Sequence, residues 1–289
     1  MNYLNNKSIY HEIYEILENR SFIQDIDIVY HYTTLDSLYK ILISKSFHCC
    51  HRSFTNDYSE FEYGINMLDN SINRLTNNSE DVAPLGEMFS KIKNPKFVKA
   101  FIGSFTTLKD SLSQWRSYAA NATGIAVGFD VKKLANYCEK NELFFGSVFY
   151  SDDSDKLFVK LMKKLSPLFN EMINNGKEED IHNGYAIFFS YILGMASFIK
   201  HNGYKEESEI RIISGNSSSL YHKFHRGLYV PFAQLDLSKE ITDLIKEIWV
   251  GPAANQELVR RSVDLMLLEN GFSDKCKVGL SKIPFRLLS

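Results

Sequence analysis

Residues 206–213 read Glu-Glu-Ser-Glu-Ile-Arg-Ile-Ile, and this alternation of charged and apolar side chains predicts a β-strand. Successive side chains of a strand point to opposite faces, so Glu207, Glu209 and Arg211 would share one face and the isoleucines the other. Side chains two apart on one face lie about 6.5 to 7 Å apart, which leaves room for a substrate oxygen or a sugar between two carboxylates. Charged residues also protect an exposed sheet edge from aggregation. This segment alone is therefore compatible both with a strand face that acts on a substrate and with a protected edge strand.

Composition indicates a globular protein with a large core. The chain has 289 residues, of which 44% are hydrophobic, enough for one elaborated domain or two close-packed lobes. Its net charge of -2 argues against nucleic-acid binding driven by overall charge, although a local basic groove remains open. The first residues do not resemble a secretory signal, and the longest apolar stretch, 185–199, is too short to span a membrane. We therefore expect a cytoplasmic protein with no membrane contact.

The cysteines and histidines do not predict a metal site or a disulfide framework. Cys49 and Cys50 are adjacent, whereas the other two cysteines are isolated in the sequence. If residues 47–51 form a strand, each face receives one His and one Cys from the run His-Cys-Cys-His, so the four cannot converge on one zinc ion. His222 and His225 could share a helix face, but no third ligand with suitable spacing accompanies them.

Short apolar runs alternate with helical patterns along the chain. Strands are predicted at residues 28–32, 47–51, 101–105, 124–129, 206–213, 228–232, 245–250 and 276–280. Helices are predicted at residues 5–19, 37–44, 57–75, 112–120, 131–141, 152–202 and 255–270. We expect an N-terminal amphipathic helix within residues 1–27, then a single α+β domain over 28–289 with a helical insertion at about 131–202. The last strand–turn–helix–strand order favours a βαβ-like unit in a mixed sheet.

An ordered set of motifs resembles family 2971 of the domains of unknown function. The motifs are His31-Tyr32-Thr33, Asn56-Asp57 with Glu60, Ser104-Phe105, Trp115-Arg116-Ser117-Tyr118-Ala119, Gly124 to Phe129, Gly203 to Arg211, Gly251-Pro252 and Ser281 to Arg286. The resemblance runs from about Val29 to the C-terminus. It implies no assigned activity, although members of the family look associated with defence against mobile elements.

A more remote similarity links the chain to ADP-ribosyltransferases, which bind NAD in a cleft between split sheets. This resemblance implies a mixed split β-sheet with helical elaborations, and NAD as the substrate. His31 resembles the first-strand His that holds a ribose hydroxyl of NAD, with Tyr32 and Thr33 beside it as further binding residues. Glu209 resembles the catalytic Glu that stabilises the positive charge on the ribose. Glu207 would orient or deprotonate the acceptor nucleophile.

The same resemblance requires an aromatic residue under the nicotinamide. Tyr118 is the first choice and Tyr58 the second, because Trp115, Arg116 and Tyr118 combine stacking rings with an Arg suited to a pyrophosphate. Arg211 either contacts NAD or pairs internally with the carboxylates. The implied protein is a defence or toxin effector that modifies a protein or a nucleic acid, with a regulatory partner.

Two other classes of function stay open. In one, Asp57, Glu60, Glu207 and Glu209 hold a divalent metal in a nuclease or phosphohydrolase. In the other, a non-catalytic sensor module binds a nucleotide or a protein through Trp115, Arg116 and Tyr118. His31, Tyr118 and Glu209 in one cleft would favour the transferase, whereas carboxylates clustered without His31 would favour the metal enzyme. Dispersal of all these residues would favour the module.

Overall fold

The computed structural model describes residues 25–55, 60–76, 100–175, 192, 194–215, 220–225, 227–253, 255–272 and 275–285. The predicted helix at residues 5–19 lies outside these ranges, as do Asp57, Tyr58 and most of the apolar stretch 185–199. The described residues form an α+β protein with a mixed sheet of ten strands, a separate two-stranded sheet, and nine helices. Within these ranges, no helix is both long enough and apolar enough to cross a membrane.

The strands are β1 (Ile28–Thr33), β2 (Ser46–His51), β3 (Phe101–Thr106), β4 (Ile125–Asp130), β5 (Phe144–Ser147), β6 (Phe149–Tyr150), β7 (Ile199–Lys200), β8 (Glu209–Ser214), β9 (Leu220–His225), β10 (Leu228–Asp236), β11 (Ile245–Val250) and β12 (Lys277–Leu280). The α-helices are α3 (Leu35–Ser44), α4 (Glu60–Thr76), α6 (Leu112–Tyr118), α7 (Val131–Lys140), α8 (Ser151–Asn175), α10 (Ile241–Leu244) and α11 (Gln256–Glu269). Two 3-10 helices, η1 (Arg52–Phe54) and η4 (Asn202–Glu207), complete the set in the described ranges.

The large sheet consists of two halves that meet at a narrow junction. One half has the order β12-β11-β4-β1, and the other contains β3, which pairs with β8 along its length and with β2 at one end. β1 pairs with β4 throughout, but it pairs with β3 at a single position, Tyr30 opposite Thr106. We call this junction the fork. Beyond it, β1 and β3 have no further paired residues, so side chains from both halves can face a common space.

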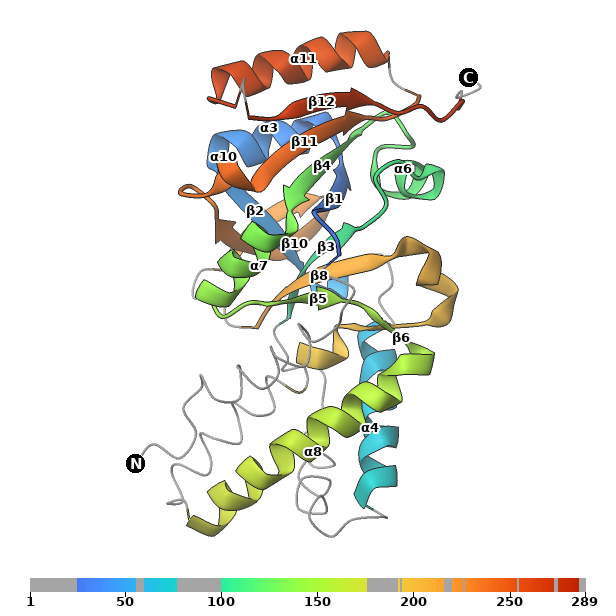
Figure 1. Ribbon diagram of the computed structural model, residues 1–289, viewed down its shortest axis with the longest axis vertical. Helices are drawn as coiled ribbons and strands as arrows, with labels where there is room; N and C mark the ends of the chain where they lie inside the picture. The colour runs from blue at the N-terminus through green and yellow to red at the C-terminus, as the bar shows by residue number, and fades with distance from the viewer. Residues whose placement is uncertain are drawn as a thin grey trace.

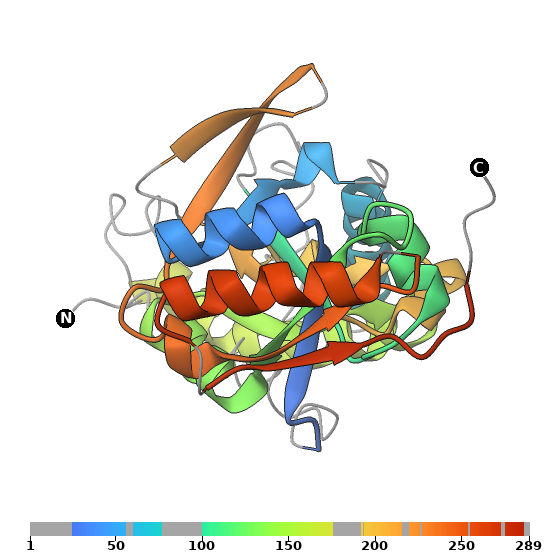
Figure 2. The same cartoon turned by 90° about the horizontal axis from the view of Figure 1, so that it is seen from above.

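Helices pack against the sheet and form two hydrophobic cores with it. Figure 2 shows α3 and α11 side by side over one face. Figure 1 shows α4 and α8 together at the opposite end of the molecule from α11 and β12. The main core lies between the sheet and helices α3, α7, α10 and α11, and a smaller core gathers Trp115 with Tyr30 and Tyr32. The smaller core positions β1 against α6, which carries Tyr118.

Local sequence signals explain several of the element ends. Thr34 caps α3, since its side-chain oxygen accepts a hydrogen bond from the Ser37 backbone N–H at 3.1 Å. Gly271 follows α11 with φ +80°, a left-handed conformation that commonly ends a helix and that glycine adopts without strain. β11, α11 and β12 form the predicted βαβ unit, with β11 and β12 parallel.

Three predicted elements differ in the structure. β8 begins at Glu209, because Ser208 has φ 46° and ends the preceding η4 helix in a left-handed conformation, so Glu207 is not part of the strand. β10 does not end at residue 232, as predicted; it continues to Asp236 because β2 pairs with its second half. His222 lies on β9, not on a helix, because the run 220–225 pairs with β10 in a hairpin.

The described part of the stretch 131–202 contains short strands as well as helices. α7 and α8 lie there, but β5 and β6 separate them and β7 lies near its end. The run Phe-Phe-Gly-Ser of β5 is buried throughout and pairs with β8, so tertiary contact with the large sheet decides its conformation.

Candidate functional site

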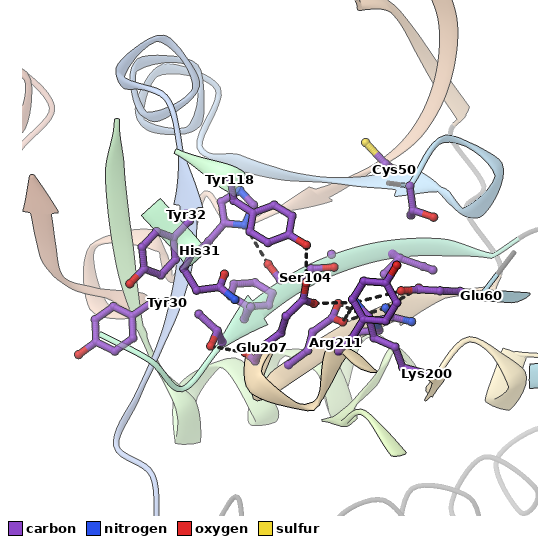
Figure 3. A pocket seen from close by; sticks show the side chains of 18 of the residues that line it. Tyr30, His31, Tyr32, Cys50, Glu60, Ser104, Tyr118, Lys200, Glu207 and Arg211 are labelled. Atoms are coloured by element: carbon purple, nitrogen blue, oxygen red, sulfur yellow. Dashed lines mark hydrogen bonds and ion pairs between the residues drawn. The ribbon is translucent and has the colours of Figure 1, made fainter. Parts of the chain in front are cut away.

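A cavity of about 280 Å³ opens at the fork and is lined by both halves of the sheet. His31 reaches it from β1, whereas Glu209 and Arg211 come from β8 on the other half. Tyr118 at the end of α6 and Glu207 at the end of η4 complete the polar wall (Figure 3). Residues that are far apart in the sequence therefore meet at the point where β1 and β3 separate.

His31 bridges the two halves of the sheet. Its Nδ1 lies 2.9 Å from the backbone oxygen of Ser104 on β3. A carbonyl oxygen only accepts hydrogen bonds, so Nδ1 carries the proton and Nε2 is left as an acceptor. The ring packs against Phe47 and Phe105 with centroid distances of 4.9 and 5.8 Å. Burial lowers the pKa of His31, so the imidazole is neutral at physiological pH.

Glu207 is held by contacts from three elements. The Tyr118 hydroxyl donates to Glu207 Oε1 at 2.8 Å, and Lys200 Nζ lies 2.7 Å from Oε2. The Thr106 hydroxyl donates to the Glu207 backbone oxygen at 2.7 Å, which fixes the chain just before the left-handed Ser208. The Glu207 side chain is 16% exposed, so this carboxylate faces the cavity with more access than Glu209, whose side chain is 6% exposed.

Glu209 is a buried, ionised carboxylate. Its Oε1 lies 2.7 Å from Arg211 Nε, and its Oε2 lies 2.9 Å from both Arg211 Nη2 and Lys200 Nζ. Burial alone would raise the pKa of Glu209, but the positive charges of Arg211 and Lys200 outweigh it and hold the pKa at about 2. The side chain therefore carries its negative charge throughout the physiological pH range.

Lys200 joins three carboxylates into one ion cluster, which we define as Glu60, Lys200, Glu207, Glu209 and Arg211. Lys200 Nζ lies 2.9 Å from Glu60 Oε1 as well as contacting Glu207 and Glu209. Arg211 Nη2 binds Glu60 Oε2 at 2.7 Å, and Nη1 donates to the Ser197 backbone oxygen. Three carboxylates against two cations leave one excess negative charge beside the cavity. Burial opposes the charge on Lys200, but its carboxylate neighbours raise its pKa above the ordinary value, so it stays protonated.

The predicted aromatic and arginine group does not form a binding surface as a whole. Trp115 is completely buried, and its Nε1 donates to Asp110 Oδ1 at 2.7 Å. Arg116 is exposed and does not line the cavity. Only Tyr118 of the three lies at the site, because a short helix turns successive side chains to different sides.

Of the two predicted binding residues that follow His31, Tyr32 lines the cavity and Thr33 does not. The Tyr32 hydroxyl donates to the Leu108 backbone oxygen at 2.9 Å, and its ring packs against Trp115, so it touches the cavity while serving the smaller core. Thr33 is buried opposite Ile125 of β4 and does not line the cavity. Arg211 lines the cavity, but its guanidinium is bound to Glu60 and Glu209, in the internal pairing that the sequence left open.

Sequence reasoning missed Lys200, Ser104 and Gln114, which all line the cavity. One signal pointed to Lys200: it is the first charged residue after the apolar stretch 185–199, and a buried Lys is rare unless it is paired. Ser104 acts through its backbone oxygen, which any residue would supply. Glu60 was expected as part of a family motif or as a metal ligand, and not as a partner of Arg211 and Lys200.

The central segment of the chain has a recognised family pattern. Residues 114–212 match the family DUF2971, described as a protein of unknown function. The DUF2971 match covers about a third of the chain, less than the resemblance from Val29 to the C-terminus led us to expect. It spans α6 to β8 and so includes Tyr118, Lys200 and Glu209, whereas His31 and Glu60 lie before it.

Comparison with curated proteins and with solved structures gave no significant match, so neither comparison supports the resemblance to ADP-ribosyltransferases.

Proposed function

We propose that this protein is an ADP-ribosyltransferase-like enzyme that cleaves NAD in the cavity at the fork. The observation that carries the proposal is that His31 from β1, Tyr118 from the adjoining α6 and Glu209 from β8 on the other half of the sheet line one cavity. The resemblance to ADP-ribosyltransferases implies these three residues for an NAD-cleaving site. Their convergence favours the transferase over the other two classes.

The charge of the site suits the reaction. Nicotinamide departs with the electron pair of its bond to the ribose, which leaves positive charge on the sugar. Glu209 is ionised and buried, so its negative charge acts across a region from which water is largely excluded. The acceptor nucleophile then bonds to the same ribose carbon and gives its proton to Glu207, the more accessible carboxylate. Tyr118 and Lys200 hold Glu207 in place for that step.

The size and charge of the cavity also limit how NAD can bind. Pockets for small ligands occupy about 300 to 1,000 Å³. A cavity of about 280 Å³ fits the nicotinamide riboside half of NAD. The excess negative charge of the ion cluster attracts the cationic nicotinamide ring and repels the pyrophosphate. We therefore place the reacting half inside the cavity and the pyrophosphate outside the cluster.

A nicotinamide-release assay with matched glutamine variants tests the proposal. Wild-type protein should release nicotinamide from NAD or transfer labelled ADP-ribose to an added protein or nucleic acid. Glu207→Gln should reduce the rate by about 100-fold or more, the range for loss of a group that transfers a proton. Glu206→Gln is the control, because Glu206 is the exposed neighbour and does not line the cavity. Equal rates for the two variants would contradict the proposed role of Glu207.

A binding module is the second candidate, because the ion cluster is fully paired and would stabilise the fold without any reaction. Calorimetric titration with NAD separates the two candidates when it is combined with the release assay. Saturable binding without release of nicotinamide, with or without acceptors, would favour the module. Release of nicotinamide would favour the enzyme.

The metal-dependent alternative gains no support from the geometry. Glu60, Glu207 and Glu209 do converge, but they converge on Lys200 Nζ, which lies where a divalent ion would have to bind. In the part of the chain that the structure describes, no group of three or more potential ligands could hold a metal ion.

A further inference from the structure

The hairpin of β9 and β10 extends from the body of the molecule and exposes several aromatic side chains. It is the orange hairpin at the top of Figure 2, and β9 lies at one end of the strand order. Phe224 is 81% exposed, and Tyr229 and Tyr221 are 57% and 45% exposed. Large aromatic side chains gathered at a sheet edge mark a binding surface rather than a core.

The part of this aromatic hairpin that carries the exposed rings, residues 220–235, has no acidic side chain, and Asp236 follows at the far end of β10. Residues 210–235 contain no Asp or Glu, although the chain as a whole has more acidic than basic residues. Lys223 and His222 lie among the exposed rings, and Lys223 Nζ is 5.3 Å from the centre of the Phe232 ring. Lys223 therefore gives the exposed rings a local positive charge on a slightly acidic protein, and this charge would attract an anionic partner.

The rings of the hairpin are arranged as stacking platforms. On one face, Tyr221 stacks on Phe232 with centroids 5.7 Å apart, and Phe232 lies 4.2 Å from His48. On the other face, His222 and Tyr229 are stacked at 4.6 Å with an interplanar angle of 4°. Flat rings interleaved with cationic side chains form the surface that binds single-stranded nucleic acid, because every base can stack and every phosphate is anionic.

We propose that the aromatic hairpin binds single-stranded nucleic acid. Bases stack on the exposed rings of Tyr221, Phe224 and Tyr229, and phosphates lie near Lys223. The series of rings from Tyr221 through Phe232 ends at His48, which lines the cavity at the fork. Phe232 is buried, so these ring contacts connect the hairpin to the wall of the candidate active site from beneath the surface. The inference does not depend on NAD cleavage; where both hold, the bound strand is the acceptor.

Fluorescence anisotropy with a labelled oligo(dT) and with an unstructured RNA tests this inference. Wild-type protein should bind at least one of them, with an affinity that falls as salt is raised, because phosphate contacts release counterions. Phe224→Ala combined with Tyr229→Ala should weaken binding by about tenfold or more, since each stacked base contributes substantially to affinity. Lys223→Glu should weaken binding and also flatten the salt dependence.

Matched controls keep the result interpretable. Leu265→Ala combined with Leu268→Ala removes two exposed apolar side chains from α11, which are 59% and 61% exposed, and should leave binding unchanged. Thermal unfolding shows whether the hairpin variants remain folded. Absence of binding to both oligonucleotides at low salt would overturn the inference. Equal binding by the wild-type protein and by a folded variant with Phe224→Ala and Tyr229→Ala would also overturn it. Sedimentation that shows a dimer, dissociated by the same hairpin variants, would assign the surface to a second copy of the chain and would also overturn it.

Discussion

At the scale of single residues, neighbouring glutamates have very different environments. Glu206 is exposed, Glu207 faces the cavity, and Glu209 is buried between Arg211 and Lys200. The sequence predicted that Glu209 and Arg211 share a face, and the strand period confirms it. It could not predict Lys200 as the second cation bound to Glu209, because that contact joins different elements through tertiary packing.

Glu209→Gln should destabilise the fold strongly. Removing one partner from a buried ion cluster leaves the remaining charges without compensation, at a cost of about 3–5 kcal/mol in the free energy of unfolding. Urea unfolding followed by circular dichroism measures this change. Glu206→Gln, as the exposed control, should change stability by less than about 0.5 kcal/mol. A loss of similar size in both variants would mean that the cluster does not form as described.

Glu209 should also contribute to the acid sensitivity of the protein. Its pKa is about 2 in the folded state against an ordinary value of 4.5, so the folded state favours the ionised carboxylate. This contribution to stability is fully present above pH 4.5 and is lost as the pH falls from 4.5 towards 2. Urea unfolding at a series of pH values should therefore show a smaller acid-induced loss for Glu209→Gln than for wild type. Parallel curves for the two proteins would contradict this account.

At the scale of elements, most strands and helices follow from local pattern, whereas their ends depend on partners. The predicted strand 206–213 begins three residues too early, because Thr106 is the last residue of β3 to pair with β8 and it lies opposite Glu209. The Thr106 hydroxyl then binds the Glu207 backbone oxygen instead of continuing the ladder. β5 and β9 were not predicted because their strand conformation also depends on pairing. β5 pairs with β8, which is distant in the sequence, and β9 pairs with β10 in a hairpin.

The left-handed Ser208 places Glu207 at the cavity, so its substitution should affect both stability and activity. Ser208→Gly should be tolerated, since glycine adopts a φ near 46° without strain. Ser208→Val should lower the free energy of unfolding by about 1–3 kcal/mol, because a β-branched residue is strained there. Urea unfolding and the nicotinamide-release assay measure the two effects. Equal behaviour of the valine and glycine variants would show that this turn does not position Glu207.

At the scale of the whole molecule, the site exists because the sheet divides. The sequence predicted the α+β class and a mixed sheet, both of which the structure confirms for the described residues. Local pattern could not locate the fork, since it arises where β1 and β3 share a single paired position. It also could not assemble a cavity from Glu60, Tyr118 and Lys200, because these residues lie on separate helices and strands of the folded chain.

If the protein acts as a defence or toxin effector, its expression should arrest bacterial growth. Glu207→Gln should relieve the arrest, because the proposed proton acceptor is removed while Glu209 keeps both of its cations. Growth curves with matched expression levels measure this effect, with Glu206→Gln as the control. Growth arrest of equal strength by Glu207→Gln and wild type would show that the toxicity does not depend on the proposed cleavage of NAD.

The most direct test of the central claim is an experimental structure of Glu207→Gln with NAD at saturating concentration. The account predicts density for the nicotinamide riboside half in the cavity at the fork, in contact with His31 and Tyr118 and beside Glu209, with the pyrophosphate outside the ion cluster. Density for NAD at another place, or an unliganded cavity at saturating NAD, would contradict it.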